Sequence, residues 1–364
     1  MTIAEYFSTD YASARERFRS AARRAAATPE SYLLPDHQGP AGETLTLDLA
    51  RHGAPDAQSA LLVIAGTHGV EGLAGSGCLV GLLEDRLHEA LPASCCLVLL
   101  HAINPYGFAW SRRVNEDGVD LNRNFVDFAR PLPSSEAYEQ LHDWVVPADW
   151  DGEARRAADA ALAAHAQQYG MAALQAAISG GQYTRPHGLF YGGVRETWSA
   201  RMLFRILHEV LPATVRRLAV LDLHTGLGPP AYGEPILDAA DPKARERALQ
   251  WFGSDVRDLS AGESVSARLT GTMARGIERV RPDLELTPIG LEFGTRPVLE
   301  VLEALRADHW LHSRGGKDSA AAPRIRRQMR EAFYSDSVAW QAAVYGRTAD
   351  LAFRALRGLA ESKT

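Results

Sequence analysis

The feature that most constrains the fold is a pair of continuous apolar runs, Ala60–Ala65 and Cys95–Leu100, separated by a segment with helical spacing. Uninterrupted apolar runs of this length are typical of parallel strands buried on both faces. The intervening segment, Glu71–Leu91, places leucine and valine side chains at helical intervals and fits a crossover helix between parallel strands. The chain is therefore predicted to be an α/β protein.

Further strands are predicted along the rest of the chain. Leu45, Leu47 and Leu49 alternate with polar residues, as in a strand with one buried face. Short apolar runs follow at Leu189–Tyr191, Leu218–Leu223, Pro235–Leu237 and Ile289–Phe293. No boundary between two domains is evident, so residues 1–364 are expected to form one domain, with an N-terminal helical extension at 1–40 and an alanine-rich helical insertion at 134–182.

Composition argues against several classes of partner. The chain carries 39 Lys and Arg against 45 Asp and Glu, a formal net charge of −6, so it lacks the basic surface that nucleic acid or an anionic membrane selects. Three cysteines in 364 residues are not a disulfide framework. The first residues lack the apolar segment of a signal peptide, and no run approaches the roughly 18 apolar residues that span a bilayer. We expect a cytoplasmic protein with neither nucleic acid nor membrane as a partner.

Three side chains with metal-ligand chemistry follow predicted strands. His68 and Glu71 come just after the run that ends at residue 65, and His224 comes just after the run that ends at residue 223. Ligands of α/β sheets bind at the carboxyl ends of strands, and a catalytic zinc takes three such protein ligands. Asp222 shares a strand face with His224 and could accept a hydrogen bond from its ring. Taken alone, each histidine could equally be a buried structural residue.

A cationic loop and a lone carboxylate complete the candidate site. Arg113, Arg123 and the amide of Asn122 suit an anionic substrate, because a guanidinium grips a carboxylate through two parallel hydrogen bonds. Fixed cations beside a metal can also stabilise an oxyanion. Glu292 lies within a predicted apolar strand, where it is either a general base or a salt-bridged structural group.

Taken in order, these residues resemble a known family. The series His68-x-x-Glu71, Asn104-Pro-x-Gly107, an arginine at 112 or 113, Asn122-Arg123-Asn124-Phe125, His224 and Glu292 is similar to that of the zinc carboxypeptidases of the carboxypeptidase A type. The similarity covers roughly residues 45–300 and is closest to a bacterial branch of undefined substrate. It implies a single α/β domain with a mixed, twisted, mostly parallel sheet of about eight strands flanked by helices.

The resemblance also implies a mechanism. Zn²⁺ would be held by His68, Glu71 and His224, with Glu292 as the general base that serves a metal-activated water. Arg113 would assist the oxyanion, and Asn122 and Arg123 would hold the terminal carboxylate of the substrate. The expected activity is that of a carboxypeptidase that cleaves the C-terminal amide bond of a small peptide.

Two departures from that family keep alternatives open. The stretch from Gly233 to Leu291 contains no tyrosine that could cap the substrate, which leaves Tyr232 as a candidate contact, and the neighbouring Arg112 is a candidate either for substrate binding or for an ion pair. The short spacing from Arg113 to Asn122 is similar to the acylase branch of the superfamily. The alternative is therefore an N-acyl amino acid amidohydrolase of the aspartoacylase or succinylglutamate desuccinylase type, acting on an acyl-amino acid with a free carboxylate. A third hypothesis is a zinc-binding module without catalysis.

Overall fold

The computed structural model describes residues 2–314, 316 and 318–361, and an eight-stranded sheet forms its centre. In chain order, the strands are β1 (Glu30–Gln38), β2 (Thr44–Gly53), β3 (Ser59–Ala65), β4 (Cys95–His101), β5 (Arg217–Pro230), β6 (Gly233–Leu237), β7 (Arg257–Asp258) and β8 (Glu285–Gly294). All seven residues of β3 and all seven of β4 are buried, as their apolar sequences predict.

The strand order across the sheet is β1-β2-β4-β3-β5-β8-β6-β7. The four central strands, β4, β3, β5 and β8, are parallel to one another. Antiparallel pairs join β2 to β4, β1 to β2 and β6 to β8, and β7 is parallel to β6. The prediction of a mixed, mostly parallel α/β sheet of about eight strands is thus confirmed.

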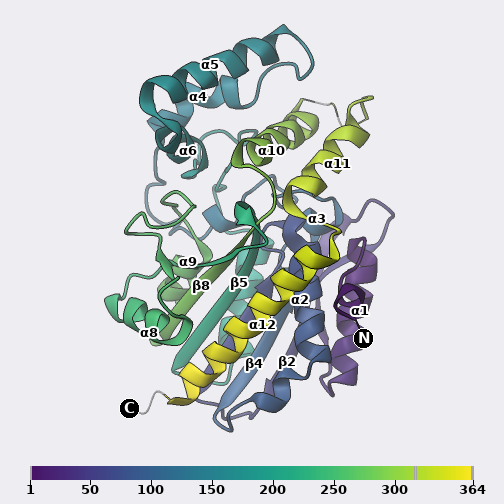
Figure 1. Ribbon diagram of the computed structural model, residues 1–364, viewed down its shortest axis with the longest axis vertical. Helices are drawn as coiled ribbons and strands as arrows, with labels where there is room; N and C mark the ends of the chain where they lie inside the picture. The colour runs from purple at the N-terminus through teal and green to yellow at the C-terminus, as the bar shows by residue number, and fades with distance from the viewer. Residues whose placement is uncertain (1, 315, 317, 362–364) are drawn as a thin grey trace.

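Helices cover both faces of the sheet. One face is packed by α1 (Tyr11–Arg24), α2 (Gly72–Glu84), α8 (Pro242–Phe252) and α12 (Val338–Glu361), with the short η1 (Ile3–Tyr6) and η3 (Leu87–Ala90) beside them. The other face is packed by α7 (Trp198–Glu209) and α9 (Met273–Val280). Figure 1 shows α12 and α2 lying across the near face of the sheet, with α1 beside them.

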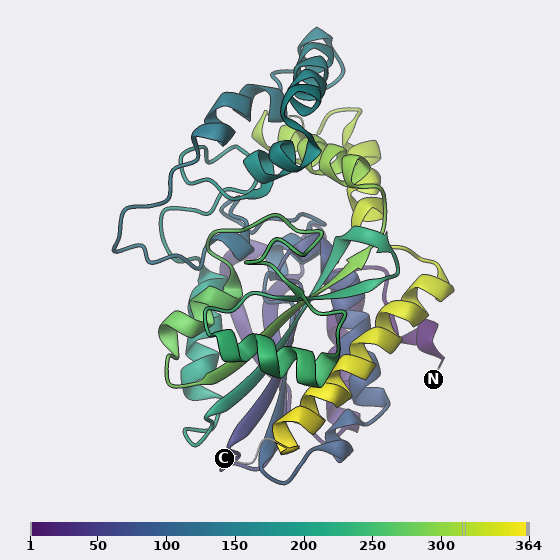
Figure 2. The same ribbon diagram turned by 60° about the vertical axis from the view of Figure 1, so that its left-hand side comes forward.

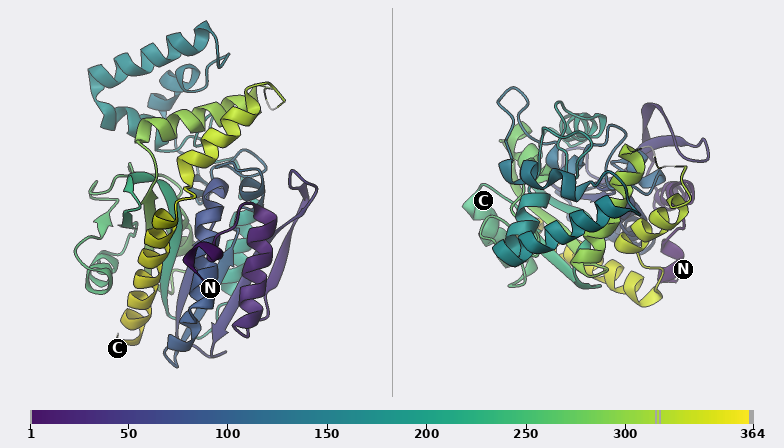
Figure 3. Two further views of the ribbon diagram at one scale, coloured as in Figure 1. Left: turned by 45° about the vertical axis from the view of Figure 1, so that its right-hand side comes forward. Right: turned by 90° about the horizontal axis from the view of Figure 1, so that it is seen from above.

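A third group of helices lies beyond one end of the sheet and is called the helical cap below. It consists of α4 (Glu136–Val145), α5 (Glu153–Tyr169), α6 (Met171–Ser179), α10 (Val298–Ser313) and α11 (Ala322–Phe333). Figures 1 and 2 show these five helices stacked at the top of the molecule, and the view from above in Figure 3 shows them lying over the sheet. The cap has an apolar core of its own, in which α4, α6, α10 and α11 all take part.

Two local expectations need correction. Residues 1–40 are not purely helical, because β1 pairs with β2 at the edge of the sheet. The run Leu189–Tyr191 is not a strand: Phe190 has a φ of +55°, which breaks an extended chain, and only an isolated bridge from Tyr191 to Gln182 forms. The Ala-rich part of the expected insertion forms two helices, α5 and α6, divided at Gly170. Within the described part of the chain, no helix has the length and apolarity needed to cross a bilayer.

Candidate metal centre

The loop after β3 is shaped so that His68 and Glu71 face the same point. The chain turns from β3 into the short helix η2 (Gly69–Glu71), which runs directly into α2. A Cβ atom at Gly69 would lie 1.9 Å from the backbone carbonyl carbon of Gly107 in α3 (Pro105–Ala109), so only glycine permits this close approach. The amide groups of Gly69 and Val70 donate to the carbonyl oxygens of the 112–113 loop. Sheet, helix and loop thereby fix the turn from several sides.

His68, Glu71 and His224 come together as a compact buried group. The Nδ1 atom of His68 lies 2.9 Å from Oε1 of Glu71, and the Nδ1 atom of His224 lies 3.0 Å from Oε2 of the same carboxylate. The two Nδ1 atoms are 3.2 Å apart. Among the described residues, this is the group of His, Cys, Asp and Glu side chains that could hold a metal ion.

The spacing of the three ligand atoms fits a tetrahedral metal. Zinc bonds to nitrogen and oxygen of about 2.0–2.1 Å imply ligand atoms roughly 3.3 Å apart at the corners of a tetrahedron. Here the two Nδ1 atoms are 3.2 Å apart, and those of His68 and His224 lie 2.9 and 3.0 Å from Oε1 and Oε2 of Glu71, respectively, which is close to this spacing. Burial alone would raise the pKa of Glu71, but the two histidines lower it to about 2. This candidate ligand therefore stays ionised.

Each histidine is backed by a carboxylate on its other nitrogen. Nε2 of His224 lies 2.7 Å from Oδ2 of Asp222, and Nε2 of His68 lies 3.2 Å from Oδ1 of Asp120. Burial alone would lower the pKa of His224, but Asp222 and Glu71 raise it well above its usual value. The carboxylates around this ring therefore favour positive charge at the point where a metal ion would lie.

Asp120 has a place in the site that the sequence analysis did not assign. It lies just before η4 (Leu121–Arg123), is fully buried, and accepts from Nε of Arg113 at 2.8 Å through its second oxygen. Burial would raise the pKa of Asp120, but Arg113 and Arg123 hold it well below its usual range. Its position between a histidine and an arginine is not visible in the sequence, because His68 lies 52 residues earlier.

Glu292 faces the histidine group from the neighbouring strand. In the parallel pair β5–β8, Glu292 is the register partner of His224. Its Oε1 accepts from the backbone amide of Leu227 at 2.9 Å. Burial and the nearby charge of Glu71 raise the pKa of Glu292 to about 7, so this carboxyl group can take up and release a proton near neutrality.

The two neighbouring arginines point to different places. Arg113 lines the cavity beside the histidine group, 3.7 Å from Glu71, and its guanidinium lies over the ring of Phe190. Arg112 points into the cap instead, where its Nε lies 3.1 Å from Asp308 of α10, and it is not among the residues lining the cavity. Of the two candidates, the structure brings only Arg113 to the site.

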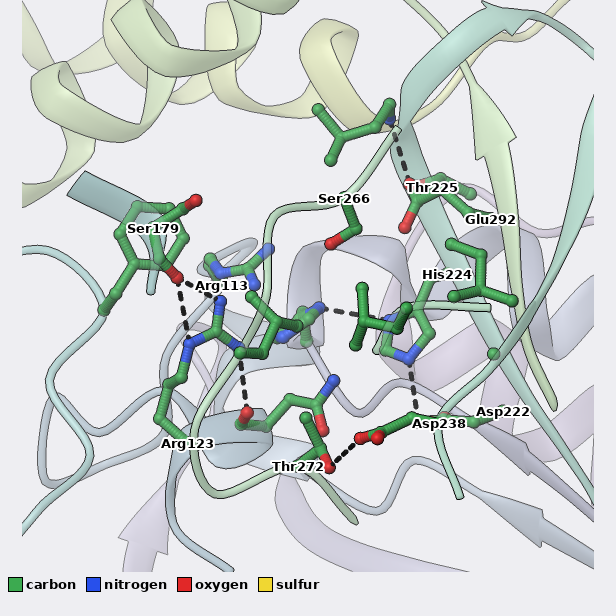
Figure 4. A pocket seen from close by; sticks show the side chains of 18 of the residues that line it. Arg113, Arg123, Ser179, Asp222, His224, Thr225, Asp238, Ser266, Thr272 and Glu292 are labelled. Carbon is green, nitrogen blue, oxygen red and sulfur yellow. Dashed lines mark hydrogen bonds and ion pairs between the residues drawn. The ribbon is translucent and has the colours of Figure 1, made fainter. Parts of the chain in front are cut away.

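Asn122 and Arg123 also line the cavity, and both are held by backbone groups. Oδ1 of Asn122 accepts from the amide of Met273 at 2.8 Å. The guanidinium of Arg123 donates to the carbonyl oxygens of Ser179 and Asn122. Figure 4 shows Arg113 and Arg123 together on one side of the pocket, with His224 and Glu292 on the other. Because Arg113 also lies 3.7 Å from Glu71, the cations border the candidate ligands at the polar part of the cavity.

Tyr232 does not lie in this cavity. It sits in the turn between β5 and β6, next to Ala231 with its φ of +61°, and 41% of its surface is exposed. That turn lies beyond the point where β5 passes His224, which directs Tyr232 to the surface. Among the described residues that line the cavity there is no tyrosine at all.

The cavity itself is largely apolar and has a volume of about 220 Å³. Its polar members gather around the histidine group, while its walls come from the sheet, the 259–274 segment and the cap. The apolar side chains of the walls include Ile236, Leu269, Ile277 and Ile289 on the sheet side, and Met171, Leu174, Ile178, Leu299 and Leu302 on the cap side. Fold and site together define an α/β protein with a His-Glu-His group that could bind a metal ion at the carboxyl ends of its strands, beside a carboxyl group of raised pKa.

The chain belongs to the family described as "Protein of unknown function (DUF2817)", whose sequence pattern matches residues 7–347. None of the curated proteins matches it in sequence.

Similar chains occur among solved structures. A metallopeptidase candidate from Shewanella amazonensis SB2B is 16% identical over 82% of this chain and 91% of its own, with a TM-score of 0.40. Carboxypeptidase A from Helicoverpa armigera is 12% identical over 89% of this chain and 74% of its own, with a TM-score of 0.47. An aspartoacylase family protein from Mesorhizobium loti is 16% identical over 79% of this chain and 67% of its own, with a TM-score of 0.36.

Proposed function

We propose that the protein is a zinc-dependent hydrolase of amide bonds next to a free carboxylate, and that it acts as a carboxypeptidase on small peptides. The observation that carries the proposal is the group His68, Glu71 and His224, with both histidines backed by carboxylates and with Glu292 in register across the strand pair. Two buried imidazoles with fixed orientation and one ionised carboxylate form the donor set of a catalytic zinc site.

Glu292 supplies the proton transfers of the proposed reaction. A zinc ion bound by the three ligands would act as a Lewis acid toward the scissile carbonyl and lower the pKa of water. Glu292 accepts a proton from the attacking water as the new C–O bond forms. It then delivers that proton to the leaving nitrogen as the C–N bond breaks, which yields a carboxylic acid and an amine. A pKa of about 7 suits both transfers, because the group is neither a strong acid nor a strong base near neutrality.

The arginines orient the substrate and stabilise charge. Arg113 is held by Asp120 beside the metal group, where its fixed cation can stabilise negative charge on the carbonyl oxygen. A guanidinium has five N–H bonds. Three of those of Arg123 donate to backbone carbonyl oxygens of the described residues, which leaves two for a substrate carboxylate.

One observation favours a second candidate, an N-acyl amino acid amidohydrolase with the same chemistry. No tyrosine among the described residues lines the cavity, so the capping contact expected of a carboxypeptidase has no candidate here. Both candidates cleave an amide beside a carboxylate. They differ in whether the acyl group of that amide is a peptide or a simple acyl chain.

The test combines metal content with turnover. The purified protein is expected to hold about one zinc per chain, and to lose hydrolysis of a peptide and acyl-amino acid panel when a chelator removes it. Glu292→Gln should keep the zinc but lower kcat about 1,000-fold, because the amide cannot accept the proton. Release of C-terminal amino acids favours the carboxypeptidase, and cleavage confined to acyl-amino acids favours the second candidate.

Glu234→Gln is the matched control, because Glu234 is a buried glutamate that pairs with Glu292 across β6 and β8 but does not line the cavity. It should retain both zinc and turnover. Hydrolysis that survives complete removal of metal, or full activity of Glu292→Gln, would contradict the proposal.

A further inference from the structure

The cap presents an unusually apolar surface to the cavity. Helix α6, with the sequence MAALQAAIS, has no charged residue, and Met171, Leu174 and Ile178 line the cavity from it. The residues of α10 that line the cavity are likewise apolar: Val298, Leu299, Val301, Leu302 and Leu305. These eight side chains are called the cap wall below.

The charged residues of α10 are directed elsewhere. Arg306 pairs with Asp159 of α5, and Glu303 pairs with Arg155 of the same helix. The two polar residues that α6 contributes to the cavity are satisfied locally: the amide of Gln175 donates to the carbonyl oxygen of Val265, and the hydroxyl of Ser179 donates to that of Gln175. No charged side chain of the described cap helices therefore lines the cavity.

The outer part of the cap wall is open to solvent. Leu174, Ile178, Val301 and Leu305 are buried in the core of the cap. Met171, Val298 and Leu299, by contrast, are 46%, 44% and 56% exposed. Three of the ten exposed large apolar residues of the described chain therefore gather at the mouth of one cavity. An apolar rim continuous with a polar centre indicates a surface that a ligand covers.

The positions of the charged residues indicate which end of such a ligand lies at the histidine group. Arg113 and Arg123 provide cations beside the histidine group, while the cap wall provides only apolar contact. A molecule that fits both has a carboxylate and an amide at one end and an apolar segment at the other. We propose that the cap wall binds the apolar segment of an amphiphilic substrate, an acyl chain of several carbons on an amino acid. This inference rests on the second candidate of the proposed function, the N-acyl amino acid amidohydrolase, and specifies the acyl group of its substrate.

The first experiment measures the effect of chain length. The zinc-loaded protein is given N-acyl amino acids with acetyl, butanoyl, hexanoyl, octanoyl and decanoyl chains, and in parallel peptides with an apolar or a polar residue before the scissile bond. Each buried methylene is expected to raise kcat/KM about fourfold until the wall is covered. A preference for apolar peptides without any turnover of acyl-amino acids would show that the cap wall binds peptide side chains, and it would overturn the proposal that the wall binds an acyl chain. A flat series in both arms would overturn the wall itself.

The second experiment perturbs the rim. Leu299→Asp should lower the ratio of kcat/KM for octanoyl over acetyl substrate about tenfold, and Leu299→Met should preserve it. The matched control is Leu33→Asp, at a leucine that is 59% exposed on β1 and does not line the cavity, and it should leave the ratio unchanged. An equal loss in the control would contradict the inference.

A binding measurement separates this inference from the proposed function. By calorimetry, octanoate should bind the zinc-loaded Glu292→Gln protein more tightly than succinate, and Leu299→Asp should abolish the difference. Octanoate binding without hydrolysis of any amide would support the cap wall while refuting the hydrolase. Hydrolysis of an amide without tighter binding of octanoate would support the hydrolase while refuting the cap wall as a binding surface for acyl chains. If sedimentation shows a dimer that Leu299→Asp dissociates while octanoate does not bind, the wall is an interface with a second copy, and the proposal is wrong.

Discussion

Asp222 and Asp120 each contact the outer nitrogen of one histidine and thereby fix the orientation of its ring. Asp222 also accepts from the hydroxyl of Thr67 at 2.6 Å, which holds its carboxylate in place behind His224. A carboxylate on the outer nitrogen fixes which nitrogen carries the proton and raises the basicity of the ligand atom.

Replacing Asp222 by asparagine should therefore weaken metal binding. We expect Asp222→Asn to lower zinc affinity about 10–100-fold, because the amide removes the negative charge behind His224. Competition with a chromogenic chelator measures this directly. Asp238→Asn is the control: Asp238 lines the same cavity but pairs with Thr272 and Arg275 rather than with a histidine. Similar losses in both variants would show that general cavity charge, rather than the histidine contact, sets the affinity.

The sequence predicts the parts of the site that follow from local rules. The placement of His68, Glu71 and His224 after apolar runs, and of Asp222 two residues before a histidine on the same strand, depends only on strand periodicity. The choice between Arg112 and Arg113 could not be predicted, because adjacent residues in a loop without periodicity point in unrelated directions. The role of Asp120 could not be predicted either, since its partner lies on another loop.

The contact between α1 and β2 shows how tertiary packing changes a strand pattern. The alternation at Leu45–Leu49 predicts one exposed face, yet Thr46 and Asp48 on that face are buried. Helix α1 covers them, and Arg15 and Arg19 reach Asp48 at 2.7 and 2.8 Å. The polar residues therefore mark a buried ion-pair site rather than a solvated face. The strand pattern could not predict this, because their partners lie about 30 residues earlier in the chain.

This ion-pair site should contribute to stability in a pH-dependent way. Burial alone would raise the pKa of Asp48, but the hydroxyl of Ser31, His101 and Arg15 lower it. Its stabilisation is therefore present above the unfolded value of 3.8 and is lost as pH falls below it, because the unfolded chain takes up the proton first. Asp48→Asn should lower the free energy of unfolding by about 2 kcal/mol at pH 7, and by less as the pH falls toward 3.

Urea denaturation at several pH values measures the difference. Asp350→Asn is the matched control, since Asp350 also lies between two arginines, Arg347 and Arg354, but its side chain is 41% exposed. An exposed pair of this kind contributes about 0.5 kcal/mol. A loss for Asp48→Asn that does not change with pH would contradict the assigned cause.

The sheet and the cap differ in how far the sequence predicts them. Burial on both faces gives the central strands a continuous apolar pattern, so their order of appearance and parallel character are readable. The cap combines α4–α6 with α10 and α11, and no local pattern links these distant segments. The absence of charge along α6 is the one signal that could have indicated a cavity wall, but an uncharged helix is equally compatible with a buried core.

Arg306 joins the two parts of the cap, and its removal should loosen the cap without disturbing the sheet. It is 5% exposed and donates to the carbonyl oxygens of Trp144 and Val145 at the end of α4 and to Asp159 of α5. Loss of these three charged hydrogen bonds in Arg306→Met should destabilise the cap by about 3 kcal/mol. Amide exchange in α4–α6 should then accelerate roughly 100-fold, while β3 and β4 keep their protection.

The same variant tests whether the cap and the metal centre contribute separately to activity. Because the histidine group is held by β3, β5 and η2, zinc content and kcat should remain, whereas KM for an octanoyl substrate should rise as the cap wall loses its position. Arg205→Met on α7, which breaks an exposed pair with Glu209, controls for the loss of an arginine. Equal acceleration of exchange in β3 would mean that cap and sheet unfold as one unit, and the apolar wall would then be inseparable from the core that holds the proposed zinc ligands.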